Sequence, residues 1–183
     1  MKSATATRRV VKMKVCLVGE EAVGKTSLVR QFLTGIFDES YIRTLGAVVS
    51  KKVVEVEDRG EPIEADVVIL DIMGKRTFMQ LFKDAYFNGA RGIVAVFDLT
   101  RQATLRNLVP WIDGVRDTVG AIPVSFLANK VDRAEDVEVS DAEIAQVLGS
   151  YGRPILKSSA KTGENVEQAF RDLAAEIVRS SAA

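Results

Sequence analysis

The sequence contains no histidine and only one cysteine among its 183 residues. The absence of histidine excludes imidazole as a general base, as a metal ligand and as a pH switch. A single cysteine can form neither an internal disulfide framework nor a thiolate metal site, and Cys16 lies in an apolar run that indicates a buried core thiol. Any metal ion must therefore bind to oxygen atoms, which favours a hard cation such as magnesium.

The chain also has no excess of either charge, because 25 basic residues balance 25 acidic ones. This balance argues against a nucleic-acid-binding protein, which normally carries a basic excess or a basic face. The longest apolar runs are only strand length, so we expect no membrane span and no signal peptide. There is no lipidation motif either, since residue 2 is lysine and the last residues include no cysteine. Together with the lone cysteine, these absences predict a cytoplasmic protein.

Short strand-like runs alternate with amphipathic helical segments along most of the chain. About half of the residues are hydrophobic (47%), which is enough for a core, and the length suits one compact domain. We predict a flexible lead-in at residues 1–8, a single domain at 9–180 and a short tail at 181–183. The expected class is α/β, with a mostly parallel six-stranded sheet, one antiparallel edge strand and helices on both faces.

The predicted elements follow from hydrophobic periodicity. Strands are expected at 10–18, 48–57, 63–70, 92–97, 122–128 and 154–156, and helices at 25–34, 105–119, 141–148 and 166–177. The segment 48–57 carries several charged residues, as an exposed edge strand does, and a turn at 58–62 joins it to the next strand in an antiparallel hairpin. Pro110 falls inside a helical pattern and predicts a local bend there.

The segment from Gly19 to Thr26 matches the phosphate-binding pattern G-x-x-x-x-G-K-S/T, and it follows a predicted strand and opens a predicted helix. Glycines let the backbone curl with its N–H groups inward, and the helix start adds partial positive charge, so phosphates bind there. Lys25 is expected to bridge the terminal phosphates, and the Thr26 hydroxyl to hold magnesium. The loop residues expected to contact the nucleotide are Glu21, Ala22, Val23, Gly24, Lys25, Thr26 and Ser27.

The segment Asn129-Lys130-Val131-Asp132 follows a predicted buried strand, at the sheet edge where ligands bind. An aspartate can accept two hydrogen bonds from the N1–H and 2-amino groups of guanine, and adenine offers no such pair of donors. Alone, this short pattern also fits a capped loop. In combination with the phosphate-binding loop, it predicts that Asp132 selects guanine.

A third segment, Asp71-Ile72-Met73-Gly74, also follows a predicted strand. The Asp71 carboxylate can hold magnesium directly or through water, and Gly74 can donate its N–H to a terminal phosphate. By itself this pattern describes any tight turn equally well.

Taken in order, these motifs together with Thr44 and Ser159-Ala160-Lys161 resemble those of the Ras superfamily of small GTPases, over about residues 12–178. The segments 41–46, 86–90 and 96–100 are most similar to Rab-like members. The resemblance implies a P-loop NTPase G domain that binds GTP or GDP with Mg²⁺ and hydrolyses GTP as a molecular switch.

The resemblance also implies roles that spacing alone does not reveal. Thr44 would close over magnesium with its hydroxyl and contact the γ-phosphate through its backbone. Phe37 would pack against the guanine ring, the stem of Lys130 would lie across the base, and the Ala160 N–H would reach guanine O6. Without the resemblance, Phe37 fits a core aromatic and Thr44 a solvated hydroxyl. The implied metal ligands are Thr26, Thr44 and Asp71, and the implied catalytic groups are Lys25, Thr44, Gly74 and Lys75; Ser159, Ala160 and Lys161 complete the nucleotide contacts.

Lys75 departs from the family pattern, because it stands where a glutamine usually orients the attacking water. An ammonium has three donors and no acceptor, so it cannot replace the amide oxygen. It could instead neutralise charge on the γ-phosphate or point to solvent, and in either case we predict slow intrinsic hydrolysis. The Glu21 carboxylate would add like-charge repulsion if it lies near the γ-phosphate, and would do little if it faces solvent; Met73 replaces the usual alanine.

Two other functions stay open at this level. One is a guanine-nucleotide-binding interaction module with negligible hydrolysis, which Lys75 and Glu21 favour; the other is an adenine-nucleotide kinase, against which Asn129–Asp132 argues. Effector, exchange-factor and GTPase-activating proteins are the implied partners, through switch regions at 36–47 and 71–80. The second switch is unusually apolar, and we expect part of this set to be core and part a partner surface: Met73, Phe78, Met79, Leu81 and Phe82.

Overall fold

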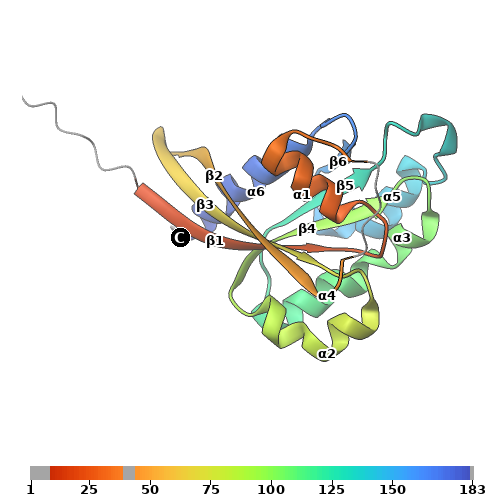
Figure 1. Ribbon diagram of the computed structural model, residues 1–183, viewed down its shortest axis with the longest axis horizontal. Helices are drawn as coiled ribbons and strands as arrows, with labels where there is room; N and C mark the ends of the chain where they lie inside the picture. Colours follow the sequence, from red (N-terminus) through yellow and green to blue (C-terminus); the bar gives the residue numbers. More distant parts are fainter. Residues whose placement is uncertain (1–8, 39–43, 182–183) are drawn as a thin grey trace, which may run out of the picture.

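The computed structural model describes residues 9–38 and 44–181; the expected lead-in at 1–8, residues 39–43 of the expected first switch and the tail residues 182–183 lie outside that part of the chain. Six strands form one sheet in the order β2-β3-β1-β4-β5-β6 (Figure 1). They are β1 (Arg9–Val18), β2 (Ala47–Asp58), β3 (Glu61–Ile72), β4 (Ala90–Asp98), β5 (Val124–Asn129) and β6 (Ile155–Ser158). The β2–β3 pair is antiparallel and the other four pairs are parallel, which confirms the predicted class.

Helices cover both faces of this sheet (Figure 1). On one face lie α1 (Lys25–Thr34) and α6 (Val166–Ser180), and on the other α2 (Arg76–Phe87), α3 (Gln102–Arg106), α4 (Leu108–Val119) and α5 (Asp141–Leu148). Two short 3₁₀ turns, η1 (Ala134–Asp136) and η2 (Gly149–Tyr151), flank α5. Each face has its own buried hydrophobic cluster, as expected for strands that are buried on both sides. Among the described residues, no helix is both long and apolar enough to cross a bilayer.

The core between α1 and α6 centres on two stacked aromatic rings. Phe32 and Phe170 have ring centroids 4.1 Å apart at an interplanar angle of 8°, and both side chains are buried. Truncation of Phe170 to alanine is expected to lower the free energy of unfolding by about 3–5 kcal/mol, because it leaves a cavity and removes the stacked partner. Urea denaturation measures this change. The same truncation at half-exposed Phe82 is the control, and equal losses at both positions would contradict the prediction.

Two predicted boundaries were wrong for identifiable reasons. The helix expected at 105–119 is interrupted at Asn107, between α3 and α4 and three residues before Pro110. Pro110 then lies in the first turn of α4, where its missing N–H would have no intrahelical acceptor in any case. The third strand continues to Ile72, so Asp71 lies inside β3, opposite Val48 of β2, rather than after it.

This topology brings the predicted motifs together. Strands β1, β3, β4, β5 and β6 run in the same direction, so their carboxyl ends meet at one edge of the sheet. The phosphate-binding loop follows β1, the segment around Gly74 follows β3, and the guanine motif begins at Asn129, the last residue of β5. Such an edge is where ligands bind in parallel α/β sheets.

Candidate nucleotide-binding site

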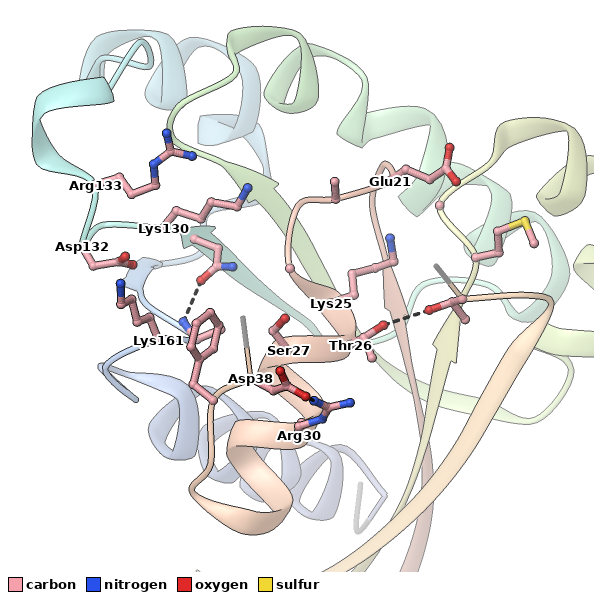
Figure 2. Close-up of a pocket in the computed structure, with 18 of the residues that line it drawn as sticks. Glu21, Lys25, Thr26, Ser27, Arg30, Asp38, Lys130, Asp132, Arg133 and Lys161 are labelled. Carbon is pink, nitrogen blue, oxygen red and sulfur yellow. Dashed lines mark hydrogen bonds and ion pairs between the residues drawn. The ribbon is translucent and has the colours of Figure 1, made fainter. Parts of the chain in front are cut away.

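A cavity of about 500 Å³ opens at the carboxyl edge of the sheet. Figure 2 shows Lys130, Asp132 and Lys161 at one end of it and Lys25 and Thr26, at the start of α1, at the other. The predicted site residues that line it are Glu21, Ala22, Gly24, Lys25, Thr26, Ser27, Phe37, Thr44, Gly74, Asn129, Lys130, Asp132, Ala160 and Lys161. Residues more than 100 positions apart in the sequence thus form one wall.

The phosphate-binding loop is fixed by glycine at a point where no side chain fits. Gly24 has φ +102°, and a Cβ added there would lie 2.3 Å from the Asn129 Nδ2 atom. That amide donates to the Val23 carbonyl oxygen over 2.8 Å, so the guanine motif holds the phosphate loop directly. Val23 itself does not line the cavity; its side chain is buried in the core.

Lys25 has the buried ammonium that a phosphate ligand requires. Its Nζ donates to the backbone oxygens of Gly19 and Glu20, each over 2.7 Å, and the residue is only 6% exposed. Burial lowers the pKa of Lys25 to about 8, although the carboxylate of Asp71 acts in the opposite direction. An anion in the cavity would therefore raise the pKa of Lys25 again and favour its charged ammonium form.

Oxygen atoms beside Lys25 form a donor set that suits magnesium. The Thr26 hydroxyl donates to Asp71 Oδ2 over 2.5 Å and lies 2.9 Å from the Thr44 hydroxyl. The second oxygen of Asp71, Oδ1, is buried and has no hydrogen-bond partner among the described residues. Burial raises the pKa of Asp71, and a cation would reverse that effect. These three residues fit Mg²⁺, which takes few protein oxygens and completes its shell with phosphate and water.

The other end of the cavity is built around Asp132. The Ser159 hydroxyl donates to Asp132 Oδ1 over 2.6 Å and so orients the carboxylate. Ala160 donates its backbone N–H to Asn129 Oδ1 over 3.2 Å, and the partly buried Phe37 lines the same end. A carboxylate and an aromatic ring are groups that a flat base with N–H donors requires, whereas the Ala160 N–H is bonded to Asn129 here.

Three predicted residues lie outside the cavity wall besides Val23. Asp71 accepts a hydrogen bond from Thr26, and Ser159 donates one to Asp132, so each contacts a residue of the cavity wall without lining it. Lys75 immediately precedes α2 with an extended backbone and does not line the cavity.

Gly74, in contrast, lies directly on the phosphate loop. A Cβ at this position would lie 2.3 Å from the Glu21 backbone nitrogen and 2.4 Å from the Glu20 carbonyl carbon. Any side chain here would therefore push the second switch away from the loop. Of the apolar residues beyond it, Met79 is core, whereas Leu81 is 76% exposed and Phe82 45%; the side chain of Phe78 lies outside the part described.

Sequence reasoning missed several residues that line the cavity: Arg30, Asp38, Ile72, Met73 and Arg133. Arg30 of α1 pairs with Asp38 over 2.8 Å (Figure 2). The helical spacing does contain a signal for Arg30, because it lies four residues after Thr26 and so faces the same side of α1. For Asp38 the only signal is its position next to Phe37.

A mostly parallel sheet with a glycine-containing phosphate loop between β1 and α1, and a cavity that reaches the segments after β5 and β6, defines a P-loop nucleotide-binding protein. Residues 14–179 match the Ras family, so the chain belongs to that family of small GTPases, as the motifs predicted. Its Rab-like character is also confirmed.

The curated relatives carry names of the same class. The chain is 33% identical to the GTP-binding nuclear protein GSP1 of Encephalitozoon cuniculi, over 91% of this chain and 77% of the relative. It is 31% identical to the Ras-related protein Rab-13 of Canis lupus familiaris (92% and 81%) and 33% identical to the GTP-binding protein YPTM1 of Zea mays (92% and 79%). The chain is accordingly a GTP-binding molecular switch with the GTPase activity of its family. Members of the Ras family generally bind guanine nucleotide together with Mg²⁺.

Proposed function

We propose that this switch hydrolyses GTP slowly on its own, because its second switch offers an ammonium where the family uses an amide. The observation that carries the proposal is the pairing of Gly74 with Lys75. Gly74 packs on the backbone of the phosphate loop, so the residue after it would lie near the terminal phosphates once they are bound, although Lys75 does not line the cavity here. That side chain is a lysine, which has no acceptor for a proton of the attacking water.

The remaining groups supply binding and charge. Lys25 and the Gly74 N–H would hold the terminal phosphates, and Thr26, Thr44 and Asp71 would hold Mg²⁺, which neutralises charge that develops on the phosphates. Glu21 lines the same cavity, and its carboxylate would add repulsion where the γ-phosphate lies. These contributions favour tight nucleotide binding combined with slow turnover.

At the base end, we assign guanine recognition to Asp132 and the Ala160 N–H, with Phe37 and the stem of Lys130 against the ring. Ser27, Asn129, Ser159 and Lys161 would complete the nucleotide contacts. The hydrogen bonds that orient Asp132 and Asn129 support this assignment, because a pre-oriented acceptor discriminates most strongly between bases.

The partner surface is proposed to lie on the second switch and the edge strand β2. Leu81 and Phe82 of α2 and Val49 of β2 are exposed apolar side chains, which are typical of surfaces that bind other proteins. Effector, exchange-factor and GTPase-activating proteins would bind there. The alternative function is an interaction module that binds guanine nucleotide with negligible hydrolysis, and the same Lys75 and Glu21 favour it.

Single-turnover hydrolysis of bound GTP, with magnesium, tests the proposal. Lys75→Gln is expected to raise the rate by roughly tenfold or more, because the amide can both donate to and accept from the attacking water. Lys75→Met is the matched control, since it removes the charge without adding an acceptor, and it is expected to stay as slow as wild type.

If the wild-type protein hydrolysed GTP as fast as Lys75→Gln, the missing acceptor at residue 75 would not slow hydrolysis, and the proposal would be wrong. An equal acceleration in Lys75→Met would also contradict it, because the charge and not the missing acceptor would then slow the reaction. Tight GTP binding with no measurable hydrolysis in any of the three proteins would favour the interaction module.

A further inference from the structure

The turn between β4 and α3 begins after a buried carboxylate that pairs with Lys130 of the cavity wall. Asp98, the last residue of β4, is fully buried. Its Oδ1 accepts from the backbone N–H and the hydroxyl of Thr100, over 3.0 and 2.7 Å. Its Oδ2 pairs with Lys130 Nζ over 2.7 Å and with Arg101 Nε over 2.9 Å. Burial alone would raise the pKa of Asp98, but these hydrogen bonds lower it overall, so the carboxylate is a fixed negative anchor.

Arg101 uses this anchor to reach the phosphate loop. While its Nε contacts Asp98, its Nη2 donates to the Glu21 backbone oxygen over 2.9 Å. The guanidinium therefore bridges two groups that are 77 positions apart in the sequence, and a planar fork is suited to this task. Asn107 adds a neighbouring contact, because its Nδ2 donates to the Glu20 carboxylate over 2.8 Å.

The bond to the Glu21 oxygen controls the direction of a neighbouring donor. Glu21 C=O and Ala22 N–H belong to one trans peptide group, so they point in opposite directions. With the carbonyl held by Arg101 outside the loop, the Ala22 N–H is directed to the cavity that Ala22 lines. Ala22 has φ +61°, which is unfavourable for a residue with a Cβ. Rotation of the peptide by half a turn would return Ala22 to negative φ and would turn its N–H away from the cavity.

We propose that Arg101 is a positioning residue that holds the Glu21–Ala22 peptide in the orientation that binds the terminal phosphates of the nucleotide. This inference rests on the proposed function, namely on the assignment of the phosphate loop. Glu21 is adjacent to Gly74 and remote from Asp132. The Ala22 N–H that Arg101 orients would therefore bind the second or third phosphate of the nucleotide and not the first. Lys130 keeps its own bond to Asp98, so the guanine end does not depend on Arg101.

The number of phosphates on the ligand separates this role from a general structural one. In the full chain with magnesium, Arg101→Gln is expected to weaken GDP binding by about tenfold to hundredfold, the effect of one hydrogen bond from a charged group. Binding of GMP, which has only the first phosphate, is expected to change less than about twofold. Both affinities come from competition against a fluorescent GDP analogue.

Two further variants sharpen the test. Arg101→Lys keeps the charge but cannot bridge Asp98 and the Glu21 oxygen together, so it is expected to behave like Arg101→Gln. Arg106→Gln is the matched control, since Arg106 is an exposed arginine of α3 whose ion pair with Glu143 spans 3.9 Å, and GDP binding should be unchanged.

Equal weakening of GDP and GMP in Arg101→Gln would overturn the inference, because Arg101 would then support the whole site. Wild-type affinity for GDP in Arg101→Lys would also overturn it, since charge alone would suffice. If the wild-type chain bound no GDP at all, the proposed function itself would fail, so the two failures are distinguishable.

Discussion

Asp132→Asn is expected to weaken GDP binding by at least roughly a thousandfold and to give the protein a preference for xanthosine diphosphate. The carboxylate offers two acceptors to the N1–H and 2-amino groups of guanine, and Ser159 orients it over 2.6 Å. An asparagine side chain would direct its own NH₂ group at the 2-amino group, which leaves two donors facing each other. Xanthine has an oxygen at that ring position, so the same asparagine pairs with it.

Equilibrium competition of a fluorescent GDP analogue by GDP, xanthosine diphosphate and ADP measures this change. Asp136→Asn is the control, because Asp136 lies in the exposed η1 turn next to the motif and pairs with Arg133. That variant should retain wild-type selectivity. If Asp132→Asn still preferred GDP over xanthosine diphosphate, guanine selection would have to lie elsewhere in the pocket.

The second large effect is expected at Lys25, as a coupling between nucleotide binding and protonation. Burial lowers the pKa of this lysine to about 8 in the free protein, and the phosphates would raise it again by favouring the ammonium. At pH 7 the lysine is mostly charged already, so binding takes up little proton. Above pH 8 it is mostly neutral, so GDP binding should take up close to one proton, and the affinity should fall as the pH rises.

Calorimetric titration in two buffers with different ionisation enthalpies measures the proton uptake directly. Lys25→Met is the control, since it should bind GDP at least roughly a hundredfold more weakly and should show no uptake that begins near pH 8. Any titration of the guanine base itself is common to both proteins and cancels in the comparison. Equal uptake in the two proteins from pH 7 to 9 would contradict the assignment of Lys25.

The sequence by itself determined the nucleotide chemistry and the family, because both depend on local residue types at fixed spacing. The phosphate-binding loop needs a glycine at position 24 and a lysine at position 25, and both belong to a pattern of eight residues. Strand and helix periodicity places this loop between β1 and α1. Asp132 belongs to a four-residue motif whose acceptor pair suits guanine, and in combination with the phosphate-binding loop it predicted guanine selection. The hairpin of β2 and β3 and the helices on both faces also followed from local patterns.

Only the tertiary structure decided which residues outside the motifs serve the site. Arg30 meets Asp38, and Arg101 meets the phosphate loop, through contacts that depend on strand order and on where α1 and α3 begin. Likewise, the helical pattern could not separate buried Met79 from exposed Leu81, because exposure depends on which helix packs beside α2. Local residue chemistry specifies what a loop can bind, whereas contacts across many sequence positions exist only once the strand ends meet at one edge of the sheet.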